Sequence, residues 1–205
     1  MIFIHFFLDM LLLSSNIYKH NLSFRYMIPE DSVLIVSDMQ NYLIDQYTSE
    51  KLSQVVDHIN TIIQDFRNAG APIIFLKHVL SGQILPELDR KDTDIVVEKT
   101  WIDGFFKTDL DKRILGTQKS KVLCVGGQAD ECLRYTVVSG CEKLQGNQEK
   151  SPGNKPLQFY VADNAIITCD WESRRNALST MNEAGARIIS YTPYAKVGKQ
   201  LEFLF

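Results

Sequence analysis

Hydrophobic positions follow two different spacings along the chain from residue 31 onward. Short, nearly continuous apolar runs are typical of strands buried on both faces, and they occur at 33–37, 72–79, 95–99, 121–127, 159–163 and 187–191. Apolar residues that recur every three or four positions predict helices, and they occur at 51–69, 108–115, 130–144 and 170–184. Because strands alternate with helices, the pattern predicts an α/β fold, a three-layer sandwich with a six-stranded, mostly parallel sheet and helices on both faces.

Single residues mark several boundaries of these elements. Gly70 follows the first helical pattern, while Asp170 and Gly185 are placed to cap and to end the last one. Polar stretches at 80–94 and 145–156 predict surface loops.

The first 15 residues are strongly apolar and raise the question of a membrane or export segment. They lack a basic start and are interrupted by His5 and Asp9, which disfavours a signal peptide. The stretch is also shorter than the roughly 20 residues of a spanning helix. It is either an extra helix packed on the domain or, as we favour, an upstream extension with the working start at Met27. We therefore treat 1–26 as an extension and 27–205 as one domain.

Composition places the chain among ordinary globular proteins. Of its 205 residues 45% are hydrophobic and 23% charged, which excludes intrinsic disorder and collagen-like repeats. The net charge of −3 and the lack of a basic stripe argue against nucleic-acid binding. Four cysteines form no C-x-x-C pair and lie in apolar or helical patterns. A reduced, cytoplasmic chain is the simplest interpretation.

Three chemically complementary residues stand at predicted strand ends. Asp38 follows the first strand, Lys99 ends the third, and Cys132 comes after a Gly126-Gly127 turn that follows the fourth. The carboxyl ends of parallel strands meet at one edge of a sheet, so we expect these groups to converge there. A thiol near a helix start and a lysine favours the thiolate, and a carboxylate can take its proton. The glycines let backbone N–H groups approach an oxyanion.

Each of these residues also has a plain structural interpretation. The aspartate suits a turn, the lysine a solvated strand end, and the cysteine a small core position. Other chemistries lack support, since no H-E-x-x-H, P-loop, G-x-G-x-x-G or G-x-S-x-G motif occurs. The four histidines are scattered without zinc spacing, so the sequence predicts neither a metal nor a cofactor.

Four segments together resemble the isochorismatase-like cysteine hydrolases, over about residues 31–192. Residues 33–41 (VLIVSDMQN) are similar to the opening strand of that family, with its D-x-Q-N element. Residues 96–114 look like its lysine segment, 122–137 (VLCVGGQADECLRYTV) like its nucleophile segment, and 159–165 like its fifth strand. The three catalytic segments in order make a specific signal, because D-x-Q-N alone is weak.

The resemblance implies a catalytic triad and an activity. Asp38 acts as general base and then acid, Lys99 favours the thiolate, and Cys132 attacks a carbonyl to form a thioester. A cis peptide between Gly127 and Gln128 directs the N–H groups of Gln128 and Cys132 at the oxyanion. The implied enzyme is an amidohydrolase that cleaves a C–N bond of a small amide or ureide, without cofactor. Family members are commonly homo-oligomers, and we expect neither nucleic-acid nor membrane partners.

Departures from the family pattern keep other functions open. Ala129 replaces the usual threonine, and Tyr42 replaces an acidic residue that often follows D-x-Q-N. A catalytically silent member that serves as a binding or scaffold protein is the main alternative. A hydrolase that uses His78 with a metal is a third, although metal-dependent nicotinamidases carry a D-x-H…H pattern where this chain has His78 alone. Members that cleave a vinyl ether lack the cysteine, so the chain fits the thiol branch.

Residues near the triad are candidates for the substrate pocket. Trp101, Phe105 and Phe106 follow Lys99 closely and, although core packing is the default for such a cluster, they are candidate pocket walls because small-ligand pockets are mostly apolar. His78 near the end of the second strand and Gln40 of the D-x-Q-N element complete this predicted set.

Overall fold

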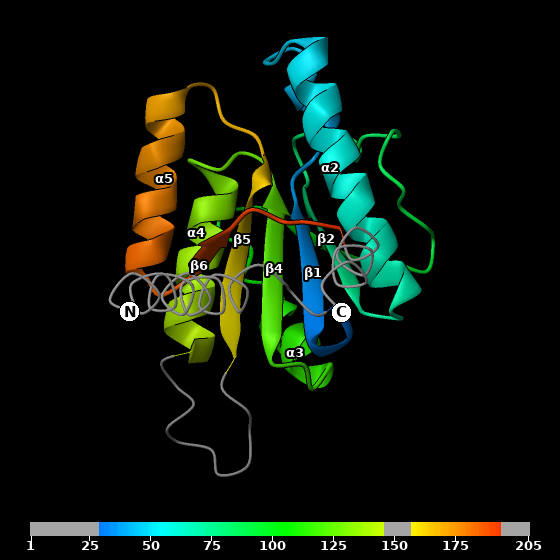
Figure 1. Cartoon of the computed structure of the whole chain (residues 1–205), viewed down its shortest axis with the longest axis vertical. Helices are drawn as coiled ribbons and strands as arrows, with labels where there is room; N and C mark the ends of the chain where they lie inside the picture. Colours follow the sequence, from blue (N-terminus) through cyan, green and yellow to red (C-terminus); the bar gives the residue numbers. More distant parts are fainter. Residues whose placement is uncertain (1–28, 146–156, 194–205) are drawn as a thin grey trace, which may run out of the picture.

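The computed structural model describes residues 29–145 and 157–193, which form one parallel sheet with helices on both faces (Figure 1). The strand order is β3-β2-β1-β4-β5-β6, and all five neighbouring pairs are parallel. The strands are β1 (Ser32–Ser37), β2 (Ile73–His78), β3 (Ile95–Lys99), β4 (Lys121–Gly126), β5 (Gln158–Ile166) and β6 (Arg187–Ile189). The predicted six-stranded α/β sandwich is confirmed, and among the described residues its sheet is wholly parallel.

Two layers of helices cover the sheet. The helices are α2 (Ser49–Asn68), α3 (Leu110–Gly116), α4 (Cys132–Gly140) and α5 (Trp171–Glu183). Shorter helical turns are η1 (Pro29–Asp31), η2 (Asn41–Leu43) and η3 (Cys141–Gln145), the last a π-helical turn that extends α4. Apolar side chains of α2 share one core with the sheet, and those of α3, α4 and α5 share the other (Figure 1).

The first long helix packs against the sheet through its predicted apolar stripe. On α2, six residues at helical spacing are buried against one face, namely Val55, Val56, Ile59, Ile62, Ile63 and Phe66. Thr48 caps its start, and Gly70 follows its end with a φ of 62°, as a glycine stop requires. Asp170 accepts a hydrogen bond from the Ser173 N–H at 2.9 Å, which confirms it as the cap of α5.

Boundaries differ from the prediction where tertiary contacts decide them. The helix predicted at 130–144 begins at Cys132 and continues into a π-helical turn after Gly140. A Cβ on Gly140 would lie 2.5 Å from the Phe159 ring, so the helix and β5 approach more closely there than periodicity alone indicates. Strand β5 runs three residues further than predicted, to Ile166, and β6 ends two residues earlier, at Ile189. The predicted extension 1–26 and most of the loop 145–156 lie outside the described residues.

Candidate active site

Asp38 follows β1 and is held in an unusual conformation at the sheet edge. Its φ is 45°, its side chain is buried, and its N–H donates to the Leu76 carbonyl at 3.1 Å. One carboxylate oxygen, Oδ2, accepts from the Ser37 hydroxyl at 2.8 Å and lies 3.0 Å from the Lys99 ammonium. The other oxygen, Oδ1, is buried and has no hydrogen-bond partner within 29–145 and 157–193. The carboxylate therefore has one occupied and one available oxygen.

Lys99 is buried, whereas the plain structural interpretation of its sequence position was a solvated lysine at a strand end. It is only 2% exposed, and besides Asp38 its ammonium donates to the carbonyls of Trp101 at 3.0 Å and Ile102 at 3.2 Å. Three oxygen acceptors therefore surround the ammonium group, which also forms a hydrogen bond with the Cys132 thiol. The loop after β3 thus folds over its own lysine and fixes the position of the cation.

The Cys132 thiol opens α4 beside this ion pair and is 8% exposed. Burial and, to a smaller extent, the Asp38 carboxylate raise the pKa of the thiol, which is about 11. The Lys99 ammonium opposes both effects by its charge and by a hydrogen bond. We expected the lysine and the helix start to lower this pKa, and desolvation outweighs them. The resting thiol is therefore protonated at neutral pH and needs a base.

The turn between β4 and α4 presents backbone N–H groups next to the thiol. The peptide between Gly127 and Gln128 is cis, at the position that the family resemblance implies. The Ala129 N–H is engaged by the Ile167 carbonyl at 2.8 Å, and the Gln128 carbonyl accepts from two N–H groups of the next turn at 3.1 Å each. For the N–H groups of Gln128 and Cys132, the described part of the chain holds no acceptor. These two are the predicted oxyanion donors.

Two residues that the sequence did not reveal hold the side chain of Gln128. Its amide donates to Gln46 Oε1 at 2.6 Å and to the Tyr47 hydroxyl at 2.9 Å, and the same hydroxyl lies 3.6 Å from the exposed Cys169 thiol. These contacts join positions more than 80 residues apart, so no local pattern could have predicted them. They fix the turn against the segment between η2 and α2.

Thr136 is a second residue that sequence reasoning missed. Its hydroxyl donates to the Cys132 carbonyl at 2.7 Å and accepts from the Gly104 N–H at 2.9 Å. A Cβ on Gly104 would lie 2.8 Å from Leu76 Cδ1, so only glycine fits between sheet and helix at this point. The contact links the loop that engages Lys99 to the helix that carries the thiol.

The predicted pocket residues divide between loop support, core and surface. The buried Gln40 amide donates to the carbonyls of His78 at 2.9 Å and Gly82 at 2.7 Å, so it holds the loop after β2 and does not face a ligand. His78 ends β2 in register with Lys99. Phe105 lies in the core against Phe159, with ring centroids 6.5 Å apart, where the prediction had a pocket wall. Nearness in sequence to the lysine did not reveal which way this ring points.

Trp101 and Phe106 do reach the surface. Both rings are exposed, and they meet edge to face with centroids 5.3 Å apart. They lie on the loop whose carbonyls engage Lys99, at the same edge of the sheet as Asp38 and Cys132. These two rings remain candidates for a pocket wall.

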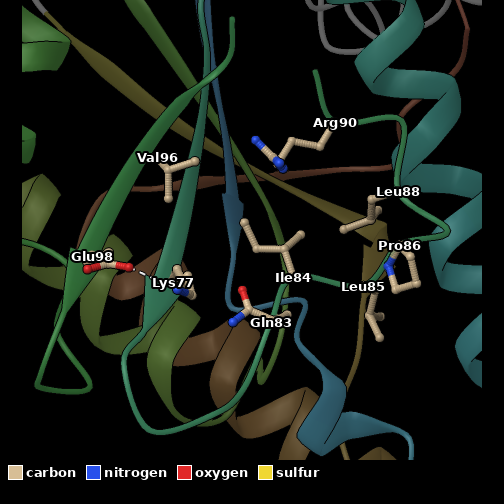
Figure 2. A pocket seen from close by; sticks show the side chains of 9 residues that line it. All are labelled: Lys77, Gln83, Ile84, Leu85, Pro86, Leu88, Arg90, Val96 and Glu98. Atoms are coloured by element: carbon tan, nitrogen blue, oxygen red, sulfur yellow. Dashed lines mark hydrogen bonds and ion pairs between the residues drawn. The ribbon is translucent and has the colours of Figure 1, made fainter. Parts of the chain in front are cut away.

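A cavity apart from Asp38, Lys99 and Cys132 lies between β2, β3 and the loop that joins them. It has a volume of about 450 Å³ and opens on the sheet face that Glu98 occupies, opposite to Lys99 because side chains alternate along a strand (Figure 2). Figure 2 shows the Lys77–Glu98 ion pair, with 2.9 Å between its charged atoms, on the β2–β3 side and the loop residues across from it. Its lining comprises Lys77, Gln83, Ile84, Leu85, Pro86, Leu88, Arg90, Val96 and Glu98.

The described residues offer neither a metal-binding cluster nor a membrane-spanning helix. No cluster of three or more histidine, cysteine or acidic side chains suited to a metal ion occurs within 29–145 and 157–193. Over the same residues, every helix is too short or too polar to cross a bilayer.

Comparison with known sequences decides the family. Residues 32–192 match the sequence model of the Isochorismatase domain. The chain belongs to the isochorismatase family. The resemblance inferred from its motifs is confirmed, and membership places the chain among hydrolases that act on small molecules. The matched span falls inside the predicted domain at 27–205.

Individual relatives of this isochorismatase-family chain are distant in sequence. It is 25% identical over 127 residues to the secreted isochorismatase effector Isc1 of Verticillium dahliae, which covers 56% of this chain and 67% of that protein. A cysteine hydrolase from Pseudomonas syringae pv. phaseolicola superposes with a TM-score of 0.67 at 17% identity, over 89% of this chain and 98% of that one. N-carbamoylsarcosine amidase from Thermoplasma acidophilum gives 0.63 at 19% identity, over 77% and 95%. Likeness at this level shows a shared fold.

Proposed function

We propose that the chain is a cofactor-free cysteine hydrolase that cleaves a C–N bond of a small amide or ureide through a thioester. One observation carries this proposal. The Lys99 ammonium lies 3.0 Å from Asp38 Oδ2, and both groups act electrostatically on the buried Cys132 thiol at the same sheet edge. An acid–base group, a cation and a nucleophile in one buried cluster match what acyl transfer through sulfur needs.

The geometry suggests which atom does what. Oδ2 of Asp38 is occupied by Ser37 and Lys99, so Oδ1 is the oxygen that accepts the thiol proton as sulfur attacks the substrate carbonyl. The N–H groups of Gln128 and Cys132 stabilise the oxyanion. Asp38 then gives the proton to the departing nitrogen, the C–N bond breaks, and a thioester remains. Water that Asp38 deprotonates attacks the thioester, which releases the acid and returns the proton to sulfur.

Burial of Asp38 raises the pKa of its carboxyl, and its contacts with Lys99 and Ser37 oppose this effect. A base with a raised pKa accepts the proton of a poorly acidic thiol more readily than a fully solvated aspartate would. The protonated resting thiol and the raised pKa of the carboxyl therefore fit a mechanism in which the proton moves from sulfur to Asp38 as the sulfur attacks. No thiolate is then present in the resting enzyme.

The alternative is a silent family member that binds a ligand or partner. The low exposure of Cys132 and its high pKa favour that possibility, since both describe an inert buried thiol. Ligand binding without turnover would be its signature.

A screen for ammonia release from a panel of small neutral and charged amides tests the proposal. Cys132→Ala should abolish release from the best substrate, because the nucleophile is gone. The matched control is Cys169→Ala, which removes an exposed thiol and should retain turnover. Full activity in Cys132→Ala would refute covalent catalysis, and no release from any amide by the wild type would favour the silent alternative.

The cellular location, the oligomeric state and the partners of the enzyme are also part of the proposal. We infer a cytoplasmic location, supported by four cysteines that are all free thiols. We further propose that it works as a homo-oligomer on small molecules, with neither nucleic acid nor membrane as partner.

A further inference from the structure

The cavity between β2, β3 and the loop that joins them is lined by more positive than negative charge. Among its lining residues Lys77 and Arg90 are cations, and Glu98 is the carboxylate. The Lys77 side chain is 19% exposed, and within the described ranges its ammonium has Glu98 as its single partner, 2.9 Å away. An ammonium group has three N–H donors, so two of them are available to a further acceptor.

Arg90 reaches the same cavity from the loop and is weakly held. Its side chain is 33% exposed, and in the described part of the chain its guanidinium contacts the Lys91 carbonyl at 3.4 Å and the Asp92 carboxylate at 3.5 Å. Both distances are long for a hydrogen bond. Figure 2 shows the guanidinium directed away from the loop, towards the side of the cavity on which Val96 lies. Such a group is free to form a paired contact with a carboxylate.

The remaining carboxylates of this loop are engaged elsewhere or solvated. Asp89 and Asp94 both lie against the Arg67 guanidinium at the end of α2, at 3.9 and 2.9 Å. Asp92 is fully exposed, so solvent screens its charge. The residues that line the cavity therefore leave one positive charge without a paired carboxylate.

Apolar side chains form the rest of the wall. Ile84, Leu85 and Leu88 come from the loop and Val96 comes from β3. Leu85 and Leu88 are buried and belong to the core that α2 shares with the sheet. The volume of about 450 Å³ lies in the range of small-molecule sites, roughly 300–1,000 Å³. The cavity thus combines two available cationic groups with an apolar surface.

Hydrogen bonds hold this loop in place without a ligand. The Leu85 N–H donates to the Met39 carbonyl at 2.9 Å, which ties the loop to the segment after β1. Further along, the Asp89 N–H donates to the side chain of Asn60 on α2 at 2.8 Å. The wall that carries Arg90 is therefore fixed at both ends, as expected of a site that forms before its ligand binds.

We propose that this cavity binds a small carboxylic acid with an apolar chain. The carboxylate lies between Lys77 and Arg90 and accepts hydrogen bonds from both, while the chain packs on Leu85 and Leu88. The cavity is separate from the proposed catalytic cluster, so the inference does not rest on the proposed function. It goes beyond that function by adding a second ligand site to the molecule.

Three six-carbon probes that differ in charge test the proposal, namely hexanoate, 1-hexanol and hexylammonium. Titration of the ¹⁵N-labelled full chain, followed by the NMR shifts of backbone amides, gives the Kd of each probe and locates it. We expect hexanoate to bind about tenfold or more tightly than hexanol, because hydrogen bonds to a charged group are gained. Its shifts should map to residues 83–90 and 95–99, and hexylammonium should bind more weakly than hexanol.

Variants separate the contributions of the charged groups. Lys77→Met and Arg90→Met should each weaken hexanoate about fivefold or more and leave hexanol unchanged, since only the carboxylate loses a partner. Glu98→Gln should tighten hexanoate about threefold, because the acceptor that competes for Lys77 loses its charge. The matched control is Lys91→Met, which removes an exposed cation of the same loop that does not line the cavity and should change the Kd by less than about twofold.

Several results would overturn the proposal. Equal affinity for hexanoate and hexanol, tighter binding of hexylammonium, or weaker binding of hexanoate to Glu98→Gln would contradict the assigned charge preference. Hexanoate shifts confined to residues 126–132 would place the acid at the catalytic cluster and would also contradict it. Cys132→Ala should bind hexanoate as the wild type does, so a loss of turnover in that variant tests the proposed function alone.

Discussion

Asp38 combines two features that are unfavourable for folding, a buried charge and a left-handed backbone conformation. A buried carboxylate with positive φ, one of whose oxygens has no hydrogen-bond partner among the described residues, is tolerated because Ser37 and Lys99 hold the other oxygen. The D-x-Q-N spacing predicted the position of this residue but not the contact of Ser37, since a serine at the end of a strand carries no such signal. The available oxygen is what would let this residue act as the proposed base.

Replacement of Ser37 by alanine tests this assignment through the pH profile. The Ser37 hydroxyl stabilises the ionised carboxylate, so its loss should raise the pKa of Asp38 further. Turnover requires the ionised base and therefore falls as pH falls through this pKa. We expect the acid limb of kcat/KM to move to higher pH by about one unit, because a hydrogen bond to a charged group contributes about 1.5 kcal/mol.

The control for this shift is Ser139→Ala. Ser139 donates to the Asp103 carboxylate at 2.8 Å, so it repeats the serine–carboxylate contact away from the proposed base. The acid limb of the kcat/KM profile of Ser139→Ala should stay at the wild-type pH. A limb that stays in place, or moves to lower pH, in Ser37→Ala would contradict the role of Asp38.

At the scale of elements, strands and helices were predictable and the turns between them were not. Periodicity predicted the buried stripe of α2 because burial of one helix face is what stabilises the element. The start of α4 was placed two residues too early, since the turn before it is shaped by contacts with β1 and β5 that lie far away in sequence. The geometry of the proposed site thus depends on the turns, which carry the weakest local signal in the sequence.

Gly126 illustrates this dependence and gives a stability prediction. Its φ is 105°, and a Cβ there would lie 2.4 Å from the Ser37 carbonyl oxygen. We expect Gly126→Ala to lower the free energy of unfolding by about 3 kcal/mol, from left-handed strain and backbone overlap together. Gly116→Ala is the control: no atom lies within 4 Å of the added methyl at the end of α3, so stability should hold or rise by up to about 1 kcal/mol. Denaturant unfolding measures both, and equal effects would contradict the close approach.

The connection between β2 and β3 is fixed by an ion pair that can be tested separately. Arg67 at the end of α2 donates to both oxygens of Asp94, at 2.9 and 3.1 Å. We expect Asp94→Asn to lower the free energy of unfolding by about 2 kcal/mol, since this bidentate pair is partly buried. Asp92→Asn should leave it unchanged, because that carboxylate is fully exposed.

The same pair predicts a pH dependence of stability. Burial raises the pKa of Asp94, but the Arg67 guanidinium, the Lys91 N–H and the charge of Arg90 together outweigh burial and hold this pKa below the ordinary value of 3.8. The stabilisation is therefore present above pH 3.8 and is lost as pH falls through the folded-state pKa. The difference in stability between wild type and Asp94→Asn should narrow below this pH, and a constant difference would contradict it.

At the scale of the whole molecule, topology brings the three groups together. Strand β1 lies next to β4 and is separated from β3 by β2 alone, so the residue after β1 meets the residues after β4, and the long Lys99 side chain at the end of β3 reaches Asp38. The order of segments predicted the convergence of Asp38, Lys99 and Cys132, because parallel strands share one carboxyl edge. It could not predict that Tyr47 holds the Gln128 side chain or that burial keeps the thiol protonated. Those outcomes depend on packing between segments far apart in the chain.

Alkylation of Cys132 in Asp38→Asn tests the central claim most directly. If Asp38 is the base, iodoacetamide at pH 7 should modify Cys132 about 100-fold more slowly in this variant than in wild type, as expected for loss of a general base. If Asp38 only repels the thiolate, its removal should lower the pKa of the thiol and speed the reaction. Equal or faster alkylation of Cys132 in Asp38→Asn would therefore contradict the account.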